Sequence, residues 1–147
     1  MRTPNLLRLL PLALALAALS AAAGAEELNW QGDLAAAQAE AARLHKPLLV
    51  DFTGSDWCGY CQKLEAEVMT TDAFRQFAGR YVLVRIDFLR HHPQDDAVKK
   101  SHLALAERYK IRGFPTLIVA DASGRELRRV EGYDPGSGAA AYLGQFQ

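Results

Sequence analysis

Two cysteines, Cys58 and Cys61, lie three positions apart in the segment Trp57-Cys58-Gly59-Tyr60-Cys61 and are the only cysteines of the chain. Residues three apart on a helix share a face, so the two sulfurs can come within disulfide distance. At a helix start, unpaired backbone N–H groups and the positive dipole end favour the thiolate of Cys58. Cys61, one turn further on, should be more buried and less acidic. The pair therefore predicts thiol–disulfide exchange, in which Cys58 attacks a disulfide of another protein and Cys61 resolves the mixed disulfide.

Three other interpretations of the pair stay open on the sequence. A purely structural disulfide would close a very short loop and contribute little folding entropy. A copper or zinc site would need further ligands, which His91 or His92 could supply. An adaptor could use the surface around the pair without turnover, and its binding would then survive the loss of both cysteines.

The first 25 residues have the pattern of a secretory signal peptide. Arg2 and Arg8 form a cationic start, residues 9–19 are an apolar run, and small residues precede a cleavage position after Ala25. A retained membrane anchor is the alternative, because the apolar stretch nearly reaches the roughly 20 residues that span a bilayer. The small residues favour cleavage, so we expect a signal peptide at residues 1–25.

The remaining residues, 26–147, have the size of one domain. The full chain carries 17 basic and 17 acidic side chains, and removal of the leader leaves the domain slightly acidic. This balance argues against nucleic-acid binding, which normally requires a basic surplus. Two cysteines exclude a multi-disulfide scaffold and a four-cysteine zinc site. We expect a periplasmic or secreted protein, in a compartment where disulfides persist and a close pair is informative.

Hydrophobic periodicity, caps and breakers predict an α/β domain with the order α-β-α-α-β-α-β-β-α. Asp33 should cap the first helix, with Leu34, Ala37, Ala41 and Leu44 as its apolar stripe. Helices between the early strands require parallel pairing, and the last two strands form an antiparallel hairpin. The helices are expected at 34–45, from 57 or 58 through 68, at 72–78, 96–109 and 138–147, and the strands at 48–52, 81–88, 116–120 and 126–131.

The chain resembles the thioredoxin family over nearly all of residues 26–147. The resemblance rests on Val50-Asp51-Phe52 leading into the cysteine segment, and on Arg112-Gly113-Phe114-Pro115-Thr116 about 55 residues later. Residues 28–30 and 52–57 are most similar to secreted bacterial thioredoxin-like proteins and to the C-terminal domain of the membrane thiol–disulfide interchange protein. The resemblance implies a thioredoxin-like fold, with a central mixed β-sheet flanked by helices and a terminal antiparallel hairpin.

The same resemblance implies roles for residues other than the cysteines. Pro115 matches the family's cis-proline, which lies against the cysteine pair and lets the preceding backbone bind a peptide as an added strand. Asp51 matches a buried acid that takes the proton of the resolving thiol, and a satisfied strand-end aspartate is the alternative. An uncompensated buried carboxylate has a raised pKa. The substrate-binding surface is expected to consist of Trp57, Gly59, Tyr60, Phe114 and Pro115.

Three departures from ordinary thioredoxins bear on the direction of electron flow. Tyr60 stands where thioredoxins have proline, Phe114 precedes Pro115, and one extra residue separates Asp51 from Cys58. Arg85 takes the place of a family lysine near the buried acid and cannot titrate there.

The sequence therefore predicts a secreted thiol–disulfide oxidoreductase, a periplasmic reductase with no metal and no cofactor. Its expected partners are disulfide-containing proteins and a membrane thiol–disulfide electron carrier. No nucleic-acid partner is expected, and the protein should be a monomer.

Overall fold

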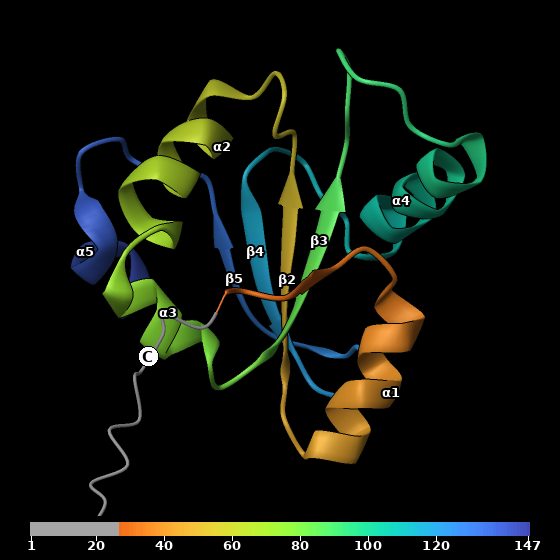
Figure 1. Ribbon diagram of the computed structural model, residues 1–147, viewed down its shortest axis with the longest axis horizontal. Helices are drawn as coiled ribbons and strands as arrows, with labels where there is room; N and C mark the ends of the chain where they lie inside the picture. Colours follow the sequence, from red (N-terminus) through yellow and green to blue (C-terminus); the bar gives the residue numbers. More distant parts are fainter. Residues whose placement is uncertain (1–26) are drawn as a thin grey trace, which may run out of the picture.

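The computed structural model describes residues 27–147, and the expected signal peptide lies outside them. Five strands form one mixed sheet in the order β1-β3-β2-β4-β5 (Figure 1). The strands are β1 (Trp30–Gln31), β2 (Leu48–Thr53), β3 (Val82–Asp87), β4 (Thr116–Ala120) and β5 (Glu126–Glu131). The helices are α1 (Leu34–Leu44), α2 (Gly59–Leu64), the π-helix η1 (Glu65–Met69), α3 (Asp72–Ala78), α4 (Asp96–Arg108) and α5 (Gly138–Gly144).

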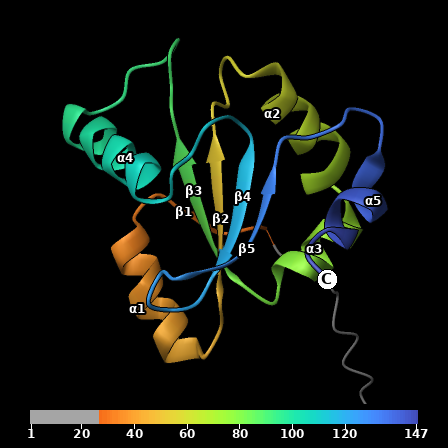
Figure 2. The same ribbon diagram turned by 180° about the vertical axis from the view of Figure 1, so that it is seen from behind.

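Strand direction places three connections at the same end of the sheet. β2 pairs with β3 in parallel, and their last residues, Thr53 and Asp87, are partners in the register. β4 is antiparallel to β2, so its first residue, Thr116, lies opposite Phe52 near the end of β2. The β2–α2 loop, the β3–α4 loop and the segment before β4 therefore meet at this end (Figures 1 and 2).

The two faces of the sheet carry separate hydrophobic clusters. Side chains alternate along a strand, so Leu49 of β2 packs with residues of α2, η1, α3 and α5, whereas Leu48, Val50 and Phe52 pack with α1. The ribbon views show α1 and α4 on one side and α2, α3 and α5 on the other (Figures 1 and 2). All six residues of β2 are buried, which agrees with its apolar residues Leu48, Leu49, Val50 and Phe52 and also places Asp51 and Thr53 in the interior.

The α/β fold and most of the expected elements are confirmed. Asp33 caps α1 through hydrogen bonds from the N–H groups of Ala35 and Ala36, 2.8 and 3.2 Å long. Strand β1 was not predicted, because two residues carry no periodicity. The expected α1 stripe is wrong at its end, since Leu44 is 38% exposed. The second helix changes to π geometry at Glu65, which sequence periodicity does not predict.

Among residues 27–147, no helix combines the length and hydrophobicity that crossing a bilayer requires.

Candidate functional site

The cysteine pair lies where the β2–α2 loop enters α2. Cys58 is the N-cap of the helix, and its Sγ accepts a hydrogen bond from the Cys61 N–H at 3.2 Å. The two sulfurs form a disulfide, with the Cα atoms 5.2 Å apart. Both cysteines are buried, with 6% of Cys58 and 4% of Cys61 exposed. In the reduced protein the same N–H would stabilise a Cys58 thiolate, because charged acceptors form the stronger hydrogen bonds.

Asp51 lies inside β2 and is 2% exposed. Its Oδ2 accepts a hydrogen bond from Arg85 Nε at 3.2 Å, whereas its Oδ1 has no hydrogen-bond partner. Burial removes the carboxylate from water and raises the pKa of Asp51 from its ordinary value of 3.8 to about 7, although the nearby Arg85 charge lowers it. The side chain can therefore hold or release a proton near neutral pH.

Arg85 connects the buried acid to the surface. Its side chain is 25% exposed, and its Nη2 lies 2.7 Å from Oε2 of Glu65 on η1. Its guanidinium carbon also lies 4.4 Å from the ring centroid of Trp30. Sequence reasoning placed Arg85 near Asp51 and missed Glu65, which has no motif around it to mark it.

Trp57 is fixed by contacts from two other segments. Its Nε1–H donates to the Phe88 carbonyl oxygen at 2.6 Å. Its ring packs edge-on against Phe114, with ring centroids 5.8 Å apart. A Cβ atom at Gly54 would lie within 2.7 Å of three atoms of the Trp57 ring, so only glycine fits there. Sequence reasoning assigned Gly54 to a loop and missed this contact, because no local pattern marks it.

The β3–α4 loop is held against the cysteine loop by Asp56. The Asp56 carboxylate accepts hydrogen bonds from the backbone N–H groups of Arg90, His91 and His92, at 2.7–3.2 Å. These hydrogen bonds hold the pKa of Asp56 well below its usual range. The Arg90 guanidinium then lies over Trp57, 3.4 Å from the ring centroid. This contact adds a positive charge beside the residue that precedes Cys58.

The remaining expected substrate-binding residues lie at the same end of the sheet. The Phe114–Pro115 peptide bond is cis, and Pro115 directly precedes β4. Thr116 Oγ1 donates to the Gly113 carbonyl oxygen at 2.8 Å, which closes the turn before the strand. Gly59 and Tyr60 form the exposed first turn of α2, and Tyr60 is 60% exposed.

The metal-site alternative is not supported by the arrangement of the side chains. Within the described part of the chain, no three His, Cys, Asp or Glu side chains gather in a way that could hold a metal ion. The His92 ring nitrogen Nδ1 instead lies 3.0 Å from Oδ2 of Asp56. His91 and His92, the ligands that this alternative requires, donate their backbone N–H groups to the Asp56 carboxylate.

Comparison with known proteins identifies the family. Residues 34–147 match the thioredoxin-like domain family. The disulfide bond reductase DsbH of Chlamydia pneumoniae is 37% identical over 117 residues, which cover 79% of this chain and 69% of DsbH. The thioredoxin-related protein DsbJ of the same organism is 32% identical over 138 residues, covering 92% of this chain and 40% of DsbJ.

Solved structures agree with these relatives. A DsbH oxidoreductase structure superposes with a TM-score of 0.73 at 32% identity, covering 99% of this chain and 92% of that one. The reduced C-terminal domain of DsbD from Neisseria meningitidis has a TM-score of 0.57 at 25% identity, covering 76% and 89%. The chain therefore belongs to the thioredoxin-like domain family, and its Cys58–Cys61 pair makes it a thiol–disulfide oxidoreductase.

Proposed function

We propose that the protein is a disulfide reductase that acts on other proteins in the periplasm or outside the cell. The observation that carries the proposal is the Cys58–Cys61 disulfide at the start of α2. The relative DsbH is named a disulfide bond reductase, which supports the direction of electron flow. The signal-peptide pattern of residues 1–25 supports the location.

The proposed reaction consists of two exchanges. The Cys58 thiolate attacks one sulfur of a substrate disulfide, which forms a mixed disulfide and releases the first substrate thiolate. The Cys61 thiol then loses its proton and attacks Cys58 Sγ, which releases the second substrate thiolate. Two electrons pass to the substrate, the released thiolates take up two protons, and the enzyme is left with the Cys58–Cys61 disulfide.

Asp51 is proposed to accept the proton of Cys61 in the second exchange. Its pKa of about 7 suits a base near neutral pH, because it can both bind and release the proton there. Trp57, Gly59, Tyr60, Phe114 and Pro115 are proposed to form the surface that receives the substrate. Regeneration of the reduced cysteine pair needs a thiol donor, and the proposed donor is a membrane thiol–disulfide carrier.

Insulin reduction by the purified protein, with dithiothreitol as the electron source, tests the proposed mechanism. Cys58→Ser should abolish turnover. Cys61→Ser should accumulate a mixed disulfide with the substrate, because the resolving thiol is missing. Ser101→Ala, a change at an exposed residue of α4, is the control and should retain activity. Full activity of Cys58→Ser would exclude the mechanism.

The reduction potential of the pair tests the direction of electron flow. A reductase should have a potential near the approximately −270 mV of thioredoxin, rather than near the approximately −120 mV of a strong oxidant. Equilibration of the protein with glutathione buffers, followed by alkylation of free thiols, measures this value. A potential close to that of the oxidant would contradict the reductase assignment and leave the exchange chemistry intact.

A further inference from the structure

Two buried polar atoms lack a hydrogen-bond partner. Among residues 27–147, the buried side-chain oxygens without any partner are Oδ1 of Asp51 and the hydroxyl of Tyr142. Asp51 is 2% exposed and Tyr142 is 1% exposed. Buried polar groups are nearly always hydrogen-bonded, and an unsatisfied one costs folding free energy. Two such atoms in one small domain therefore require an explanation.

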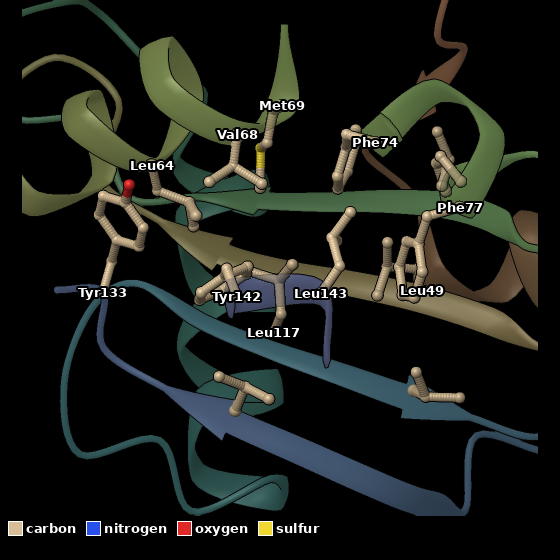
Figure 3. Close-up of a cluster of buried hydrophobic side chains, with 14 residues drawn as sticks. Leu49, Leu64, Val68, Met69, Phe74, Phe77, Leu117, Tyr133, Tyr142 and Leu143 are labelled. Carbon is tan, nitrogen blue, oxygen red and sulfur yellow. The ribbon is translucent and has the colours of Figure 1, made fainter. Parts of the chain in front are cut away.

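Both side chains occupy the same layer of the fold. Alternation along β2 places Asp51 on the face of Leu49, which packs in the cluster beneath α2, η1, α3 and α5. Tyr142 belongs to α5 and is part of that cluster, together with Leu117, the register partner of Asp51 on β4 (Figure 3). The charge of Asp51 also contributes to raising the pKa of Tyr142, although burial is the larger cause.

The other ionisable groups of this layer do not satisfy the two atoms. The charges that act on Asp51 are those of Arg85 and Asp87 on β3 and Glu65 on η1. Of these, Arg85 binds only Oδ2 of Asp51.

Tyr133 is the second ionisable neighbour of Tyr142. Its ring packs edge-on against that of Tyr142, with centroids 5.5 Å apart. The Tyr133 hydroxyl donates to Oε2 of Glu67 at 2.6 Å, so its donor is already in use. One hydroxyl donor, on Tyr142, and one carboxylate acceptor, on Asp51, remain.

We propose that Tyr142 is a positioning residue for the proton-accepting Asp51, its hydroxyl being linked to Oδ1 by one buried water molecule. Buried waters form two to four hydrogen bonds and join polar groups that would otherwise be unsatisfied. Tyr142 donates a hydrogen bond toward the ionised carboxylate and keeps its own proton throughout. The proposal rests on the proposed function only in the role given to Asp51.

Removal of the hydroxyl should raise the pKa of Asp51. A hydrogen bond to an ionised group is stronger than one to its neutral form, so the Tyr142 link favours the carboxylate. Tyr142→Phe deletes one oxygen atom and keeps the ring. We expect the midpoint of Asp51 to rise by about one pH unit, that is, about tenfold weaker acidity.

The titration is read from the Asp51 carboxyl carbon by ¹³C NMR on the oxidised protein, and Asp51→Asn identifies the signal. Tyr109→Phe is the matched control. It also removes a buried hydroxyl, which donates to the Gly124 carbonyl oxygen, but Tyr109 lies in the cluster on the other face of the sheet. The Asp51 midpoint in Tyr109→Phe should equal that of the wild type. An unchanged or lower midpoint in Tyr142→Phe would overturn the proposal.

Two further measurements test the link between Tyr142 and Asp51. A high-resolution crystal structure of the wild type should contain a water within hydrogen-bond distance of both oxygens, and its absence would overturn the proposal even if Tyr142→Phe fails to fold. The pH profile of insulin reduction should move in the same direction as the NMR midpoint. If the wild-type protein fails to reduce insulin while the Asp51 midpoint still rises in Tyr142→Phe, the proposed function alone is contradicted, because the titration is measured without turnover.

Discussion

Replacing Asp51 with asparagine should remove a large part of the pH dependence of folding stability. The pKa of Asp51 in the folded protein is about 7, above its ordinary value of 3.8. The folded state therefore holds one more proton than the unfolded state between these values. The contribution of Asp51 to stability should be highest below about pH 4, fall as the pH rises toward 7, and level off above that. Asparagine cannot ionise, so the variant should not show this fall.

The size of the effect follows from the shift. Each pH unit between the folded and unfolded pKa values corresponds to ~1.4 kcal/mol. A rise from 3.8 to about 7 therefore amounts to roughly 4 kcal/mol of lost stability in the ionised state. Solvent screening reduces this little, because Asp51 is 2% exposed. Asparagine keeps the size of the side chain but loses the charge contact with Arg85, which changes stability at every pH. The change in stability between two pH values is therefore a better measure than the stability at one pH.

Urea unfolding of the oxidised protein, followed by circular dichroism at about pH 5 and about pH 8.5, measures this difference. The wild type should lose more stability between the two conditions than Asp51→Asn, by roughly 3 kcal/mol, because the unfolded carboxyl group is already largely ionised at about pH 5. Asp72→Asn is the control, because its carboxylate is 89% exposed and its loss should leave the wild-type pH dependence. Equal losses in Asp51→Asn and the wild type would show that burial does not govern this carboxyl group.

Two more changes test the packing around Trp57. Gly54→Ala should push the indole of Trp57 out of its position and lower the free energy of unfolding by about 1–3 kcal/mol. In a Trp30→Phe background, the fluorescence of Trp57 should then shift to longer wavelength. An unshifted spectrum would contradict the steric argument. Asp56→Ala should release the β3–α4 loop, so that the amide protons of residues 90–92 exchange faster with solvent, while unchanged protection would exclude Asp56 as the clamp.

Much of the fold was predictable because its signals are local. Asp33 and Pro47 mark the ends of the first helical segment, and the apolar run of β2 marks a buried strand. The exceptions have physical causes. β1 is too short to show a period, and Leu44 stays exposed because the α1 contacts with the sheet involve the residues before it.

Candidate site residues divide in the same way. Cys58 and Cys61 were found because their spacing alone carries the chemistry, and Asp51, Trp57 and Pro115 were found through family resemblance. Asp56 could not be found, since its partners lie 34–36 positions further along the chain. The contact depends on two loops that meet only after β2 and β3 pair.

The sequence by itself determined the reactive pair and the elements that carry it, because helix starts, caps and strand runs depend on neighbouring residues. Only the tertiary structure decided what surrounds the pair. Pairing of β2 between β3 and β4 buries Asp51 and raises its pKa, and it brings Arg85 to one carboxylate oxygen. Packing of α5 on the same layer brings the Tyr142 hydroxyl into the same cluster. Desolvation and hydrogen-bond partners come from segments far apart in the chain, so no local pattern encodes them.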